Sequence, residues 1–145
     1  MIAEQRDLGE RLLEYGASII KLVRGLPNSL VGRRVGDQLL RSGTSAGANY
    51  EEARGAESKD DFAHELQVSL KEMRESNYWL RLLLVSGEVP ADRIAALLDE
   101  SNQLRAILSK SVATTKGKAR GNGADSAEST RVTETNRRLP LGLHF

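Results

Sequence analysis

The sequence predicts an all-α protein: an antiparallel up-down-up-down four-helix bundle over residues 1–115, followed by a basic, disordered tail over residues 116–145. Four long segments carry apolar residues three or four positions apart, which is the period of a helix buried along one face. Alternating runs of β-branched residues, which indicate strands, are nearly absent. Leu, Ala, Arg and Glu are common, and these residues favour helices. The length of 145 residues suits a single domain.

The first helix is predicted over residues 2–24. Gly25 and Pro27 follow it as stop signals. Its apolar positions recur at spacings of 4, 3, 4, 3 and 4, which places them on one face. They are Leu8, Leu12, Tyr15, Ile19, Leu22 and Leu26.

The second helix is predicted to begin after a cap at Asn28 or Ser29 and to end near Ala56. The positions on its buried face, which we call its stripe, have the same spacing, but the residues become smaller and more polar toward the C-terminal half. This change favours close packing there, with hydrogen-bond partners for the polar groups. The stripe consists of Val35, Leu39, Ser42, Ala46, Asn49 and Ala53.

The third helix is predicted over about residues 59–86, after a capping box formed by Ser58 and Asp61 and before a terminating Gly87. The fourth is predicted to carry Pro90 in its first turn and to end near Thr115. The stripe of the third helix is Phe62, Leu66, Ser69, Met73, Ser76, Leu80 and Leu83, widened by Tyr78 and Trp79. That of the fourth is Ile94, Leu97, Ser101, Leu104, Leu108 and Val112.

Composition limits the classes of function. The chain has no cysteine, which excludes disulfides and thiolate metal sites. No apolar run is long enough for a signal peptide or a membrane span, so we expect a soluble, cytoplasmic protein without a membrane partner. Residues 1–115 hold 15 basic and 17 acidic residues, whereas residues 116–145 hold 6 and 3. A nearly neutral body counts against strong nucleic-acid binding, although a local basic patch remains compatible with it.

Four glycines of the second helix share one face of it: Gly32, Gly36, Gly43 and Gly47. Each glycine costs a helix about 1 kcal/mol relative to alanine, so an offsetting gain is expected. Close approach of another helix supplies such a gain. The approaching helix belongs either to the same chain, as close helix packing, or to another subunit, as an oligomer interface.

Arg33, Arg34 and Arg41 form the most pronounced basic patch of the body, on the outer face of the second helix. One interpretation is a solvated face held by the i,i+4 pairs of Arg33 and Arg41 with Asp37. The alternative is contact with the phosphates of a nucleic acid, helped by the basic tail.

No catalytic or metal site can be assembled from the sequence. The chain has two histidines, His64 and His144, and Asp61-Phe-Ala-His64 is a single partial match to the paired Glu-x-x-His motifs of two-metal bundles. No serine can be assigned a positioned base. The segment 43–47 lacks the lysine that follows in a phosphate-binding loop. We therefore expect no enzyme activity, no cofactor and no bound metal.

Residues 40–83, LRSGTSAGANYEEARGAESKDDFAHELQVSLKEMRESNYWLRLL, resemble the core of a bacterial family of four-helix bundle proteins. The family includes proteins encoded in intervening sequences of large-subunit ribosomal RNA genes, and the accessory variability determinant of diversity-generating retroelements. The first and fourth helices, RLLEYGASIIKLVRGLP and LLDESNQLRAILSKSV, also fit the family pattern. The resemblance extends over about residues 4–115 and omits the tail.

The resemblance implies a non-enzymatic bundle that assembles into a ring, a homopentamer in the retroelement protein. It also implies RNA or DNA as a partner, and a reverse transcriptase where the gene lies in a retroelement. Two functions follow as hypotheses. The first is an oligomeric accessory or scaffold protein with weak RNA or DNA binding. The second is a protein–protein interaction module that binds no nucleic acid.

Overall fold

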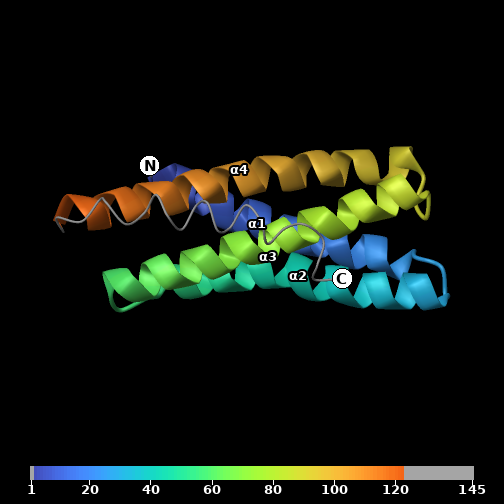
Figure 1. Cartoon of the computed structure of the whole chain (residues 1–145), viewed down its shortest axis with the longest axis horizontal. Helices are drawn as coiled ribbons and strands as arrows, with labels where there is room; N and C mark the ends of the chain where they lie inside the picture. The colour runs from blue at the N-terminus through green and yellow to red at the C-terminus, as the bar shows by residue number, and fades with distance from the viewer. Residues whose placement is uncertain (1, 123–145) are drawn as a thin grey trace, which may run out of the picture. The chain divides into compact units, whose positions relative to one another are not determined.

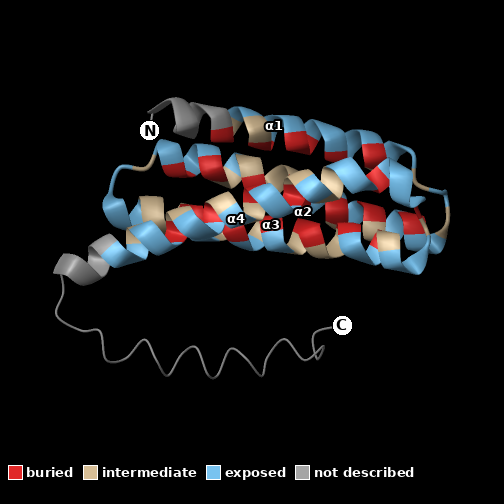
Figure 2. Cartoon of the chain, turned by 90° about the horizontal axis from the view of Figure 1, so that it is seen from above, coloured by how far each residue is buried: buried red, intermediate tan, exposed pale blue. Residues whose placement is uncertain are grey.

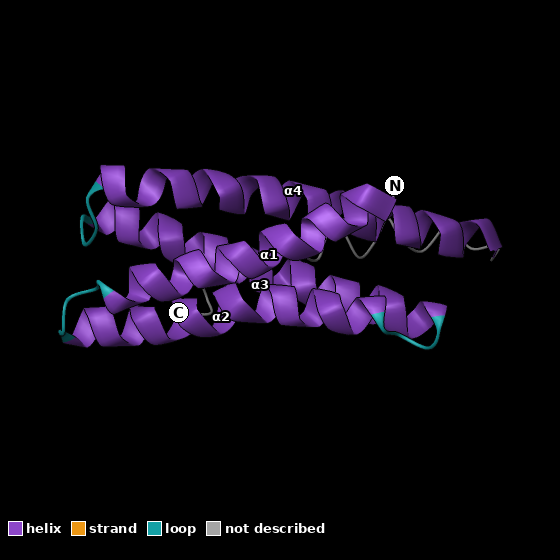
Figure 3. Ribbon diagram, turned by 180° about the vertical axis from the view of Figure 1, so that it is seen from behind, coloured by secondary structure: helices purple, strands orange, loops and turns teal. Residues whose placement is uncertain are grey.

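The computed structural model describes the backbone of residues 2–122 and the side chains of residues 8–117. This part of the chain forms four helices and no strand: α1 (Ile2–Arg24), α2 (Leu30–Arg54), α3 (Lys59–Ser86) and α4 (Ala91–Asn122) (Figure 3). The predicted all-α four-helix fold is confirmed. The chain divides into two compact units, residues 1–113 and residues 114–145, and the bundle is the first of them.

Successive helices of the bundle run antiparallel (Figure 1). Gly47 of α2 lies against Leu12 in the middle of α1, whereas Gly36, earlier in α2, lies against Val23 near the end of α1. Both the α1–α2 connection and the α3–α4 connection therefore lie at one end of the bundle, and the α2–α3 turn lies at the other.

The core is built from the predicted stripes, which face inward in all four helices (Figure 2). Half-buried residues such as Val35, Phe62 and Leu97 pack at its margin. The apolar stripe residues with almost no exposure are Leu12, Tyr15, Ile19, Leu39, Ala46, Ala53, Leu66, Met73, Leu80, Leu83, Ile94, Leu104 and Leu108. The 3–4 spacing of apolar residues was thus sufficient to identify the buried side of each helix.

The helix ends follow from local chemistry. Ser29 caps α2, because its side chain accepts a hydrogen bond from the backbone N–H of Gly32 at 3.0 Å. Ser58 caps α3 in the same way, with the N–H of Asp61 as donor at 3.0 Å. Gly87 ends α3 with φ of 78°, a left-handed conformation that glycine adopts without strain.

The expected end of α4 near Thr115 was wrong. The helix continues to Asn122, so the first residues assigned to the tail are helical. Residues 116–122 contain no proline, and Gly117 and Gly121 among lysines, alanine and arginine do not suffice to end the helix. Pro90 directly precedes α4 instead of occupying its first turn. The expectation of a disordered tail concerns mainly residues 123–145, which lie outside the described residues.

Polar stripe residues find partners inside the bundle, as the sequence predicts. The Ser69 hydroxyl donates to the Ala46 carbonyl at 2.7 Å and so connects α3 to α2. The Ser42 hydroxyl donates to the Gln38 carbonyl at 2.8 Å within α2. Among the described side chains, no buried nitrogen or oxygen is left without a hydrogen-bond partner.

Candidate interaction surfaces

The glycine face of α2 is covered by α1 and by the α1–α2 connection of the same chain. A Cβ atom added at Gly43 would lie 2.8 Å from Cγ1 of Ile19, closer than real side chains approach. At Gly47 it would lie 3.4 Å from Cβ of Leu12, which is ordinary contact. The glycines therefore allow the backbone of α2 to approach α1. We call this contact the glycine seam.

Gly36 and Gly32 lie nearer the connection. A Cβ at Gly36 would lie 3.2 Å from Cδ1 of Leu26. One at Gly32 would lie only 2.0 Å from the carbonyl oxygen of Pro27, so that position requires glycine. The glycine face had two interpretations, close helix packing within the chain and an oligomer interface. The neighbours at all four positions fit the first.

An apolar groove runs along the outer side of the glycine seam, between α1 and α2. Its volume is about 510 Å³. Leu13, whose exposed fraction is 67 %, and Ile20, at 39 %, stand at its edge. Its floor consists of small residues: Gly9, Gly16, Ala17, Thr44, Gly47 and Ala48. Sequence reasoning missed this groove because Leu13 and Ile20 lie outside the buried stripe, although their spacing of seven residues marks a second row on α1.

The three arginines of the predicted basic patch have different surroundings. Arg41 makes ion pairs with two carboxylates of α3, to Glu72 at 2.9 Å and to Glu75. Its carboxylate partners thus lie on α3 and not along α2 at Asp37, where the sequence had suggested an i,i+4 pair. Arg33 donates to the side-chain oxygen of Asn28 at 3.0 Å. Arg34 is exposed.

Glu75 is the centre of the α2–α3 ion-pair cluster. It accepts hydrogen bonds from Arg41 and from the indole N–H of Trp79, the latter at 3.0 Å. Burial raises the pKa of Glu75, but these two hydrogen bonds and the charges of Arg41 and Lys71 outweigh it, so that the pKa lies below its usual value. The hydrogen bond to Glu75 is also the main reason why the pKa of Arg41 is raised. Arg41 therefore joins α2 to α3 at the surface.

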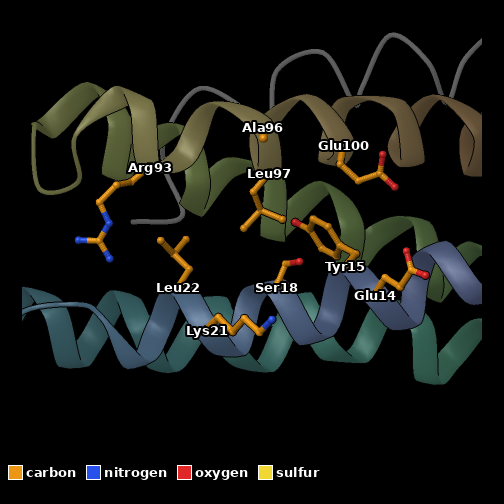
Figure 4. Close-up of a pocket in the computed structure, with 9 residues that line it drawn as sticks. All are labelled: Glu14, Tyr15, Ser18, Lys21, Leu22, Arg93, Ala96, Leu97 and Glu100. Atoms are coloured by element: carbon orange, nitrogen blue, oxygen red, sulfur yellow. The ribbon is translucent and has the colours of Figure 1, made fainter.

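A polar hollow of about 490 Å³ lies between α1 and α4 (Figure 4). Glu14 and Lys21 line it from α1, and Arg93 and Glu100 line it from α4. Glu100 is already engaged, because the guanidinium of Arg11 donates two hydrogen bonds to it at 3.1 and 2.9 Å. The hollow therefore offers mixed charges without a free acid–base pair of matched geometry.

Tyr15 closes the inner side of this hollow. Its hydroxyl and that of Ser76 are 2.5 Å apart, which joins α1 to α3. Burial raises the pKa of Tyr15, while hydrogen bonds with Ser76 and Ser101 lower it and the charge of Glu100 raises it further. The hydroxyl therefore stays protonated at neutral pH and cannot serve as a base. Next to it, the Asn77 amide donates to Ser101 at 2.8 Å, which joins α3 to α4.

His64 is exposed on α3, and His144 lies outside the described residues. Among the side chains of residues 8–117, no group of three or more His, Cys, Asp or Glu is arranged to hold a metal ion. None of the helices within residues 2–122 has the length and apolar character needed to cross a membrane.

Comparison with known proteins finds a matching family and similar solved structures. The model of the 23S rRNA-intervening sequence protein family matches residues 7–110. A solved structure, described as a protein of unknown function from the S23 ribosomal protein family of Bacteroides thetaiotaomicron, is 30 % identical to this chain with a TM-score of 0.66. The alignment covers 74 % of this chain and 96 % of the other. No curated protein matches the sequence.

Proposed function

The chain belongs to the 23S rRNA-intervening sequence protein family, and from this premise we propose that it is a non-enzymatic subunit of a ring-like homo-oligomer that binds RNA weakly as an accessory or scaffold protein. Its family resemblance favours five subunits. The observation that carries the proposal is the apolar groove beside the glycine seam, because it leaves large apolar side chains of a charged surface helix in contact with water.

The groove has the character of a subunit contact. Leu13 and Ile20 are exposed in the single chain, and the small residues between them allow another helix to approach closely. Exposed apolar patches rimmed by polar residues are typical of protein–protein contact sites. Glu10 and Glu51 supply such a rim. We therefore assign the groove to a second copy of this chain.

The absence of enzyme activity is supported by what the hollows contain. Within the described residues, the polar hollow offers a protonated tyrosine and a carboxylate that is already paired with Arg11. A nucleophile with a positioned base, which covalent catalysis requires, is not assembled there. Weak RNA binding is supported by the exposed arginines and by the family's name, which refers to a ribosomal RNA sequence.

Light scattering tests the assembly. We expect the purified chain to have several times the 15.9 kDa mass of one subunit, five times for a pentamer. Leu13→Glu places a charge in the groove and should lower the mass toward that of one subunit while circular dichroism remains helical. Val85→Glu is the matched control, because Val85 is 84 % exposed on α3 and lies outside the groove. A wild-type chain that is monomeric at high concentration would refute the assembly.

Binding to a structured RNA at about 50 and 200 mM salt tests the second half of the proposal. We expect weak binding that decreases steeply as salt rises, because phosphate contacts release counterions. If no binding is measured at the lower salt concentration, the proposed RNA function is wrong. A protein partner that co-purifies after nuclease treatment would then favour the alternative function, an interaction module for proteins.

A further inference from the structure

The near-neutral charge of the body conceals a separation of charge along the bundle. We call the end that carries the α1–α2 and α3–α4 connections the loop end; it comprises residues 20–37 and 81–95 (Figure 1). These segments hold six basic and three acidic residues, a net charge of +3. The other end, residues 8–14, 46–65 and 106–113, holds four basic and eight acidic residues, a net charge of −4.

The basic residues of the loop end are exposed and form no ion pair within the described part of the chain. They are Lys21, Arg24, Arg33, Arg34, Arg81 and Arg93. The ion pairs of the body instead engage Arg11, Arg41 and Arg54, which lie away from this end. The sequence had grouped Arg41 with Arg33 and Arg34, but the structure separates it from them by its binding to Glu72 and Glu75.

Contacts around the α1–α2 connection hold several of these cations near one another. The guanidinium of Arg93 on α4 crosses to Gly25, where a Cβ atom would lie 2.6 Å from its Nη2. Lys21 and Arg93 line the same hollow (Figure 4). Arg33 donates to Asn28 in the connection itself. Cations of α1, α2 and α4 therefore meet at this connection.

We propose that the loop end is the surface through which this protein contacts the phosphates of RNA, a proposal that rests on the RNA function inferred above. Exposed guanidinium groups without a carboxylate partner are available for bidentate phosphate contacts at no cost from breaking an ion pair. In a ring, each subunit would present the same cations, so that weak contacts add up along one RNA molecule.

The loop end and the apolar groove assigned to assembly are different surfaces of the bundle, so one does not exclude the use of the other. The groove extends along α1 from Gly9 to Ile20, where the loop end begins, and none of the loop-end cations lines it. The opposite end repels RNA because of its net negative charge. One molecule can therefore use its side for subunit contact and its loop end for RNA.

A pair of charge-matched triple variants tests this assignment. The loop-end triple is Arg24→Gln, Arg33→Gln and Arg34→Gln. The control triple, Lys59→Gln, Lys71→Gln and Arg74→Gln, removes three exposed cations from α3 and changes the net charge equally. Binding of the full chain to a hairpin RNA is measured at several salt concentrations, with circular dichroism and light scattering to establish that both variants keep their fold and assembly.

We expect the loop-end triple to bind at least about 10-fold more weakly at low salt and to lower the slope of log K against log salt by about 2. The control triple should change the affinity by less than about 2-fold. Equal losses in both triples, or an unchanged affinity in the loop-end triple, would overturn this location while the RNA function stands. No RNA binding by the wild-type chain would overturn the RNA function itself, and the location with it.

Discussion

Two helices of the bundle, α2 and α4, meet their neighbours in different ways. The backbone of α2 approaches both α1 and α3 closely, through glycines on one side and through Ser42 and Ala46 on the other. Residues 91–113 of α4 are joined to α1 and α3 by hydrogen bonds between side chains, from Arg11 to Glu100 and from Asn77 to Ser101. Their contacts are made by long side chains, and the polar hollow lies beside them. The packing of α2 thus depends on residues with small side chains or none, whereas the packing of α4 depends on larger side chains.

The largest expected effect comes from adding atoms to the glycine seam. Gly43→Leu should lower the free energy of unfolding by more than about 3 kcal/mol, because Ile19 already fills the space that a Cβ would occupy. Urea unfolding measures the loss. Ala106→Leu creates the same side chain at an exposed position of α4 and should change stability by less than about 0.5 kcal/mol. A stable Gly43→Leu variant would show that α1 and α2 do not approach closely.

A smaller effect is expected from removing one hydrogen bond between α1 and α3. Tyr15→Phe should cost about 1–3 kcal/mol, because it removes the partner of the buried Ser76 hydroxyl. The double variant Tyr15→Phe/Ser76→Ala should recover part of that loss, since no polar group is then left unpaired. A double variant less stable than the sum of both single changes would contradict this account.

The same tyrosine predicts a dependence of stability on alkaline pH. Burial raises the folded-state pKa of Tyr15 above its unfolded value of 10.0. The contribution of its neutral form is therefore complete below pH 10 and is lost as pH rises through the folded-state pKa. The free energy of unfolding, measured in urea, should decrease more steeply above pH 10 for the wild type than for Tyr15→Phe. Identical slopes for the two proteins would contradict this prediction.

The smallest effect is expected at the surface, where Arg41 joins α2 to α3. Glu75→Gln should cost about 0.2–1 kcal/mol at pH 7, because the ion pair is solvent-exposed on the arginine side. The pKa of Glu75 is lowered, so the contribution of its charged form is present above the usual carboxyl pKa of 4.5 and is lost as pH falls through the folded-state value. Thermal melting from pH 7 to pH 3 should show a smaller decrease for Glu75→Gln than for wild type. An equal decrease would mean that Arg41 does not hold this carboxylate.

The sequence contained enough information to predict most of the fold. Spacings of three and four residues identified the buried face of each helix, and Ser58 and Gly87 identified the ends of α3, because capping is a local interaction. The end of α4 was missed, since the helix continues through Gly117 and Gly121 in its last turns. The glycine face of α2 indicated close packing, but only coordinates could show that α1 is the partner.

The candidate surfaces were less predictable. Sequence reasoning placed Arg41 with Arg33 and Arg34 because they share one side of a helix. Its ion pairs with Glu72 and Glu75 are 31 and 34 residues away along the chain, beyond any local pattern. The apolar groove was missed for a similar reason, because its lining comes from two helices whose register depends on the glycine seam.

The glycine content of α2 has a consequence for the order of folding. A helix needs a favourable balance between nucleation and propagation, and four glycines weaken that balance in residues 30–54 before any packing occurs. Docking of α1 therefore has to accompany the coiling of α2, and both segments are synthesised before α3 and α4. The first two helices should consequently form as a cooperative hairpin during translation, onto which the second half of the chain is later added.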